Sequence, residues 1–158
     1  MAANQSSTGL GTFRAIVKKY PGCEPRKVLS DLAAWSGESG RWFVAAKDAG
    51  CFDLALEFAR SGRTDPRTLS RASRDSLGED TQFSLEAGRL AIQFILGGYG
   101  YELTGMDMMD AYQYFMAAAH ALGIGSQARA EVFAIAAERP GIFSDILVRL
   151  CSAASQRD

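Results

Sequence analysis

The sequence contains few of the residues that build catalytic and metal-binding sites. It has one histidine, His120, and three cysteines, Cys23, Cys51 and Cys151, which lie far apart and form no CxxC pair. The common zinc-ligand spacings are therefore absent, and no serine lies in a GxSxG elbow. An odd number of cysteines without a secretory signal argues for reduced thiols, so we expect a cytoplasmic protein. We predict no metal, no cofactor and no catalytic residue.

Long apolar runs and a dominant charge sign are also missing. The longest apolar stretch, LAIQFILGG from Leu90, is too short and too interrupted to span a bilayer. The N-terminal residues MAANQSSTGLGT have neither the cationic start nor the apolar core of a signal peptide. The net charge is −1, so no global field would draw the molecule to nucleic acid or an anionic membrane. Electrostatic recognition would need a local patch.

Strand signals are missing too, because no stretch alternates apolar and polar residues for long enough and runs of β-branched residues are absent. Apolar residues instead recur every three to four positions between glycine and proline stops. The sequence predicts an all-α fold of about seven or eight helices in antiparallel hairpins, as an irregular bundle or a short solenoid-like array. We expect one helical domain over 12–153, a mobile tail over 1–11 and a polar tail over 154–158.

Helix starts are predicted where a side chain able to cap the first turn precedes a periodic apolar stretch. Such starts are Asp65 before Pro66, Asp80 or Thr81, Thr104, and Ser126. Thr104 is followed three positions later by Asp107, a variant of the capping box. Stops are predicted at Gly37, Gly50, Gly97-Gly98 and Gly123. The helix that starts near Asp80 is apolar over much of its circumference, so we expect it to be central.

Two stripes at helical spacing predict buried faces. One comprises Val28, Leu29, Leu32 and Trp35, and the other Met108, Tyr112, Phe115, Ala119 and Leu122. Only the Met106 end of the second helix is expected to be exposed. Cys51 and Cys151 lie in apolar periodic stretches and are expected to behave as small hydrophobic residues. His120 is expected to be partly exposed and to have no catalytic role, since no carboxylate on its own helix can orient it.

Two segments show a weak internal similarity that supports hairpins. AAKDAG from Ala45 is followed by LALEFA, and AAHALG from Ala118 is followed by AEVFAIA. The stretch AKDAGCFDLALEFARSGRTDP resembles a tetratricopeptide-type hairpin, with Gly50, Phe52 and Ala55 at nearly that repeat's spacing. This resemblance implies helical-hairpin packing.

A second resemblance covers Gly50 to about Leu122. The segments TDPRTLSRASRD and LAIQFILGGYGYELTG, followed by MDMMDAY, look like a helical region of uncharacterised bacterial proteins. Some of those proteins also carry a SWIM-type zinc finger, which this chain lacks. The resemblance implies a helical fold and supplies no catalytic residue.

Five arginines form a candidate binding surface, here called the arginine face: Arg60, Arg63, Arg67, Arg71 and Arg74. The last three are spaced four and three apart, so they share one side of a helix. Guanidinium groups suit carboxylate and phosphate recognition. Three alternatives stay open: a solvated face or one self-paired with the acidic segment 79–110, binding of an acidic protein, and binding of nucleic acid. The net charge disfavours the last.

The loop Gly97–Tyr101 is a second candidate, because its glycines let backbone approach a ligand and Tyr99 and Tyr101 add flat amphipathic surface. The competing interpretation is a helix C-cap at Gly97 or Gly98, with both tyrosines over the hairpin crossing.

Because no catalytic constellation is present, the sequence favours a non-enzymatic helical protein-interaction domain, a scaffold or adaptor. It would bind another protein, with an acidic protein as one candidate, through a helical groove and the arginine face. The alternative is a small-molecule or nucleotide-handling enzyme or ligand binder with a site near Gly97–Tyr101 and the arginines. A third alternative is a homodimer held by an exposed helix stripe.

The binding hypothesis makes a direct prediction. Reversing Arg67 and Arg71 to Glu should abolish capture of the partner without lowering the melting temperature, because a solvated binding face adds little stability. Affinity capture and thermal denaturation measure the two effects. An equal loss in both would mean that the face is structural.

Overall fold

The computed structural model describes residues 9–155. Over this range nine α-helices and one 3₁₀ helix are formed and no strand is present, which confirms the all-α prediction. Residues 10 and 11 of the predicted N-terminal tail belong to the first helix, and the rest of that tail, apart from Gly9, lies outside the described residues. None of the helices in the described range is long and apolar enough to cross a membrane.

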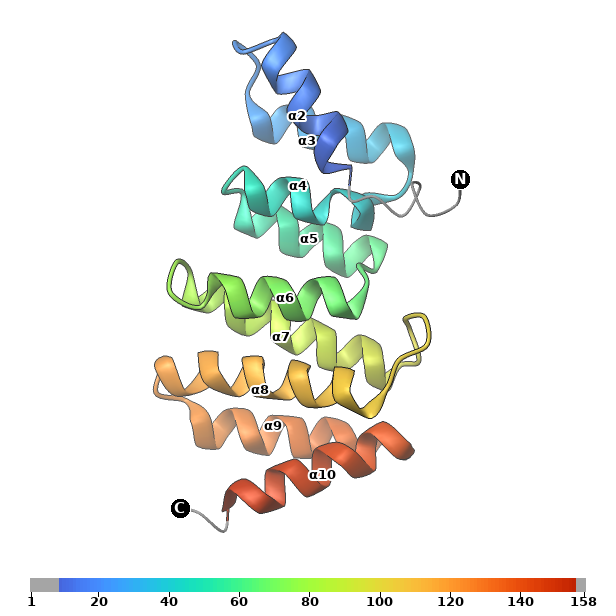
Figure 1. Ribbon diagram of the computed structural model, residues 1–158, viewed down its shortest axis with the longest axis vertical. Helices are drawn as coiled ribbons and strands as arrows, with labels where there is room; N and C mark the ends of the chain where they lie inside the picture. The colour runs from blue at the N-terminus through green and yellow to red at the C-terminus, as the bar shows by residue number, and fades with distance from the viewer. Residues whose placement is uncertain (1–8, 156–158) are drawn as a thin grey trace. The chain divides into compact units, whose positions relative to one another are not determined.

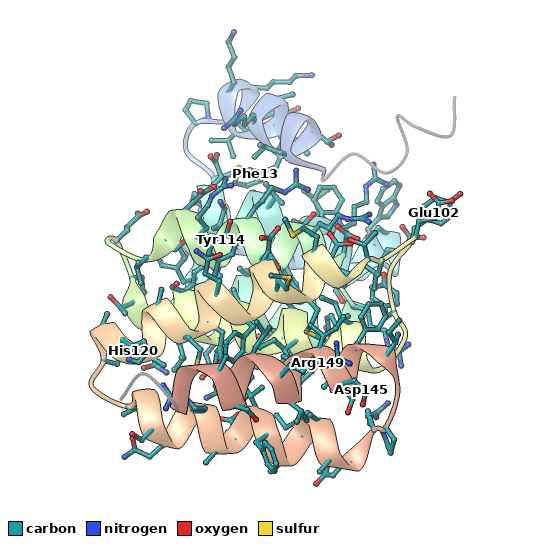
Figure 2. All side chains as sticks on the ribbon, turned by 60° about the horizontal axis from the view of Figure 1, so that its bottom comes forward. Phe13, Glu102, Tyr114, His120, Asp145 and Arg149 are labelled. Carbon is teal, nitrogen blue, oxygen red and sulfur yellow. The ribbon has the colours of Figure 1, made fainter. Side chains whose placement is uncertain are left out.

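The chain divides into two compact units, residues 1–64 and 65–158. The helices of the first unit are α2 (Leu10–Lys19), α3 (Pro25–Ser36), the 3₁₀ helix η1 (Ser39–Trp42), α4 (Phe43–Asp48) and α5 (Phe52–Gly62). Within this unit α5 packs against η1 and α4, and α2 packs against α3 and α4 (Figure 1). Phe13 from α2 (labelled in Figure 2) is buried, and Trp42 and Phe43 are the largest fully buried side chains of this unit.

The stripe predicted on α3 is wrong at Trp35, whose exposed fraction is 82%. The helix buries Leu29, as predicted, together with Ala33, while Val28 and Leu32 are half-buried. At about 100° per residue, Trp35 lies roughly 120° around the axis from Leu29, so it points away from the buried side. A three- and four-residue spacing fixes a stripe but not which edge of it faces the core.

The second unit comprises α6 (Pro66–Ser76), α7 (Thr81–Leu96), α8 (Gly105–Ala121), α9 (Gly125–Glu138) and α10 (Ile142–Ser155). As predicted, α7 is central: it lies against α6, α8 and α10, and α6 also lies beside α8 (Figure 1). Two buried serines join α6 to α7. Ser73 Oγ donates to the Ser84 carbonyl at 2.7 Å, and Ser84 Oγ donates to the Ser73 carbonyl at 2.5 Å.

Local signals determine most helix ends. Asp65 accepts a hydrogen bond from the Thr68 amide, and Asp80 accepts one from the Phe83 amide, so both predicted caps are confirmed. The predicted Ser126 cap is wrong, because α9 begins at Gly125 and Ser126 is already its second residue. The N-cap residue, Ile124, offers no side-chain acceptor. In sequence, a serine inside the first helical turn cannot be told from a serine that caps the helix.

The two similar segments close their helices in the same way. Gly50 and Gly123 have φ of 78° and 75°, and each follows a last turn closed by two backbone hydrogen bonds. For the second segment these are Gly123 N–H to the His120 carbonyl and Ile124 N–H to the Ala119 carbonyl. This is the Schellman closure, in which glycine adopts the left-handed conformation without a Cβ penalty. The internal similarity therefore encodes a shared turn geometry.

The stripe predicted on α8 is confirmed from Met108 to Ala119 and wrong at Leu122. Met108, Phe115 and Ala119 are completely buried and Tyr112 is nearly so, whereas Leu122 is 38% exposed. Leu122 is the C-cap residue of α8, so it lies at the very end of the stripe. The Met106 end is exposed, as predicted.

The tight packing of α7 at Gly88 makes a stability prediction. A Cβ on Gly88 of α7 would lie 3.0 Å from Phe115 Cα of α8 and from Ser73 Oγ of α6. Gly88→Val should therefore lower the free energy of unfolding by about 1–3 kcal/mol through overpacking. Urea denaturation followed by circular dichroism measures the change. The control is Gly78→Val, since a Cβ there meets nothing within 4 Å; equal effects of the two variants would contradict tight packing at Gly88.

Candidate functional site

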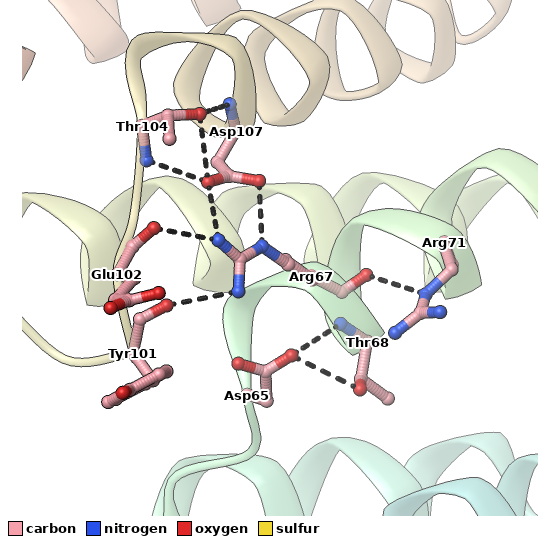
Figure 3. A network of polar contacts seen from close by, with 8 residues as sticks. All are labelled: Asp65, Arg67, Thr68, Arg71, Tyr101, Glu102, Thr104 and Asp107. Carbon is pink, nitrogen blue, oxygen red and sulfur yellow. Dashed lines mark hydrogen bonds and ion pairs between the residues drawn. The ribbon is translucent and has the colours of Figure 1, made fainter.

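Arg67, near the start of α6, is the centre of a polar network (Figure 3). Its Nε and Nη2 donate to the two carboxylate oxygens of Asp107 at 2.9 and 3.0 Å. Nη1 donates to the Tyr101 carbonyl at 3.0 Å, and Nη2 also donates to the Glu102 carbonyl at 2.9 Å. All three guanidinium nitrogens are thus used inside the protein.

Asp107 also stabilises the start of α8, as the third residue of that helix. Its carboxylate accepts from the Thr104 amide at 2.7 Å, while the Thr104 hydroxyl accepts from the Asp107 amide at 3.4 Å. The predicted capping box is confirmed, with Asp in the place usually held by Glu. The hydrogen bond from Arg67 is the main cause that holds the pKa of Asp107 below its usual value, and the Thr104 bonds add to it.

The three arginines of α6 have three different environments. Arg67 pairs with Asp107, which shows for this residue the predicted self-pairing with the acidic segment. Because Arg67 makes four hydrogen bonds inside the protein, its reversal to Glu should lower the melting temperature, contrary to the prediction made for a solvated face. Arg74 pairs with its neighbour Asp75, and this hydrogen bond raises the pKa of Arg74. Arg71 donates from Nε to the Arg67 carbonyl at 3.2 Å. Its two terminal nitrogens have no hydrogen-bond or ion-pair partner among the described residues.

A hollow of about 290 Å³ lies between α6 and α8. We call it the α6–α8 groove; it is lined by Arg67, Ser70, Arg71, Arg74, Asp107, Asp110 and Tyr114. Of these, Asp110 has a carboxylate that forms no hydrogen bond or ion pair with any other described residue. The groove therefore presents one guanidinium and one carboxylate that are both available to a ligand.

The other two arginines of the arginine face belong to the first unit. Arg60 lies in the last turn of α5, and Arg63 is its C-cap residue, with φ of 54°. Arg67, Arg71 and Arg74 belong to the second unit, and the structure brings these three together at one groove.

Neither tyrosine of the predicted ligand loop lines the α6–α8 groove. Tyr99 closes α7: its amide donates to the Phe94 carbonyl at 2.9 Å, and its ring meets the Phe94 ring edge-on at 5.8 Å. Tyr101 is 77% exposed and contributes its backbone carbonyl to Arg67. The loop is thus a helix closure that Arg67 ties to α6, and Gly97 is the C-cap residue of α7, as the competing interpretation expected.

A second hollow, of about 390 Å³, lies between α9 and α10. Its lining comprises Ser126, Arg129, Ala130, Phe133, Cys151 and Ser152. Cys151 is buried, as predicted, and burial raises the pKa of its thiol. Burial also raises the pKa of the neighbouring Tyr112 to about 12. Both shifts favour the protonated, uncharged side chain.

The remaining candidates do not form a site. His120 is exposed, and its ring covers Gly125, where a Cβ would lie 2.5 Å from Nδ1. Across the described range, no group of three or more His, Cys, Asp and Glu residues is arranged to hold a metal ion.

Sequence reasoning missed Asp110 and Tyr114 as groove residues. With Asp107 they recur at three- and four-residue intervals on α8, a polar stripe that was a usable signal. Their position opposite the arginines depends on α6 and α8 lying side by side, which no local pattern indicates.

The comparisons do not assign the chain to a family: no family model matches it, and no similar curated protein or solved structure was found.

The network predicts a pH-dependent stability. Asp107→Asn should lower the free energy of unfolding at pH 7 by about 1–2 kcal/mol, because it weakens a helix cap and leaves Arg67 without its charge partner. Since the pKa of Asp107 is lowered in the folded chain, its contribution is complete above the unfolded value of about 3.9 and is lost as the pH falls through the folded value.

Urea denaturation at pH 7 and pH 3 measures this effect, and the difference between wild type and Asp107→Asn should shrink at pH 3. Asp110→Asn is the matched control on the same helix, because that carboxylate has no partner to lose among the described residues. A constant difference at both pH values would show that charge at Asp107 does not stabilise the fold.

Proposed function

We propose that this chain is a non-enzymatic protein-interaction domain that holds a carboxylate-bearing segment of a partner protein in the α6–α8 groove. The observation that carries the proposal is Arg71, which lines the groove and whose terminal nitrogens have no partner among the described residues. A guanidinium offers two parallel donors that match a carboxylate. Arg71 is the natural anchor for an acidic side chain.

The neighbours of Arg71 support this role. The Arg71 Nε is held by the Arg67 carbonyl, and Arg67 is itself fixed by four hydrogen bonds. A guanidinium that is held at Nε loses less conformational entropy when its terminal nitrogens bind a partner. Arg67 therefore supports the site, and Arg71 makes the contact.

A small carboxylate is the second candidate ligand, because the groove volume of about 290 Å³ is close to the lower end of small-molecule sites. It would accept hydrogen bonds from the same Arg71 nitrogens. The helical walls favour a peptide, since a groove between two parallel-running helices continues past a single anchored group. Free glutamate serves as the competitor that separates the two candidates.

A charge reversal tests the proposed function. A fluorescein-labelled peptide with several Asp and Glu residues among neutral ones is titrated with protein, and the anisotropy is measured. Arg71→Glu should weaken binding about tenfold or more, because it replaces attraction by repulsion at the anchor. The melting temperature should not change, since Arg71 is exposed and its only described side-chain bond is to a carbonyl.

The matched control is Arg149→Glu, an exposed arginine on α10 of the same unit (Figure 2). It changes the net charge equally and should leave the affinity nearly unchanged. Equal weakening by both reversals would mean nonspecific attraction and would overturn the proposal. Complete displacement of the peptide by millimolar glutamate would assign the groove to a small ligand instead.

A further inference from the structure

The α6–α8 groove lies between two helices that run in the same direction, and residues of α6 face residues of α8 across it in three successive pairs. We call each facing pair a rung. Arg67 of α6 pairs with Asp107 of α8, and at the far end Arg74 lies close enough to Tyr114 for that hydroxyl to contribute to its raised pKa. The partners in both rungs are separated by forty positions in the sequence. Arg71 and Asp110 lie between these rungs, on opposite walls at about the same level.

This middle rung is open. Arg71 and Asp110 line the same hollow, yet no ion pair joins them, and neither side chain has another charge partner among the described residues. Closing such an exposed pair would stabilise the fold by only about 0–1 kcal/mol. Both charges therefore remain available to a ligand at little cost to the protein.

The open rung restricts what can bind. A lone carboxylate or phosphate that reached Arg71 would also approach the Asp110 carboxylate, and like charges across an interface oppose binding. A ligand with an adjacent cation would satisfy both walls. This requirement disfavours nucleic acid, whose backbone carries negative charge only.

We propose that the α6–α8 groove recognises an extended peptide segment in which an acidic residue is followed directly by lysine or arginine, the acid binding Arg71 and the base binding Asp110. Successive side chains of an extended chain point to opposite sides. An adjacent acid–base pair thus reaches α6 with one side chain and α8 with the next. The inference rests on the proposed function and specifies its partner.

Three peptides of equal length test the spacing. The first carries Glu-Lys within Gly and Ser residues, the second has the same composition with one Gly between Glu and Lys, and the third replaces Lys by Gln. Isotope-labelled full-length protein is titrated with each, and NMR shifts report the affinity and the residues contacted. The adjacent pair should bind about two- to fivefold more tightly than the other two peptides, as expected for one exposed ion pair.

Asp110→Asn tests the residue responsible. It should remove the preference for the adjacent pair while leaving the Lys-to-Gln peptide bound at least as tightly as by wild type. Asp145→Asn, which removes an exposed acid on α10, is the control and should keep the preference (Figure 2).

The outcomes separate the inference from the proposed function. If the spaced and adjacent peptides bind wild type equally, or Asp110→Asn keeps the preference, the acid–base inference is overturned. The proposed function survives that result when the Lys-to-Gln peptide still shifts α6 and α8 resonances and Arg71→Glu abolishes the shifts. Absence of shifts at α6 and α8 with all three peptides would overturn both.

Discussion

The ion pair between Arg67 and Asp107 organises the second unit around one point. It joins the first turn of α6 to the first turn of α8 through two parallel hydrogen bonds. The same guanidinium fixes the carbonyls of Tyr101 and Glu102, so the loop between α7 and α8 is held by a residue far from it in sequence. Because Asp107 also caps α8, loss of this pair would release a helix start, a loop and a groove wall together.

Stability and recognition are divided between consecutive turns of α6. Arg67 is committed to the interior of the network and cannot bind a partner without breaking it. Arg71, one turn later, lines the groove and donates from Nε to the Arg67 carbonyl, and its terminal nitrogens have no partner among the described residues. This arrangement explains why equal spacing does not mean equal function: one arginine supplies the rigid support that makes the next one an effective anchor.

Sequence patterns predicted those helix ends that depend on hydrogen bonds between residues close in the chain. The Asp65 and Asp80 caps, the capping box at Thr104 and the glycine closures follow from hydrogen bonds within a few residues, and they are present. Trp35 departed from its predicted stripe because the phase of burial depends on neighbouring helices. The adjacency of basic and acidic segments suggested mutual pairing, but only packing selects Asp107 as the partner of Arg67 and leaves Asp110 open.

The unpaired charges of Arg71 and Asp110 are not apparent from the net charge of the groove. Together with Asp75, the charged groove residues carry three positive and three negative charges, so the site is neutral in sum. Pairing of Arg67 with Asp107 and of Arg74 with Asp75 removes two of each sign. What remains is a separated pair, Arg71 and Asp110, on facing helices. A neutral site with separated charges binds ligands of a single sign less tightly and selects by the distance between charges, so Asp110 confers specificity even where it lowers affinity for a simple acid.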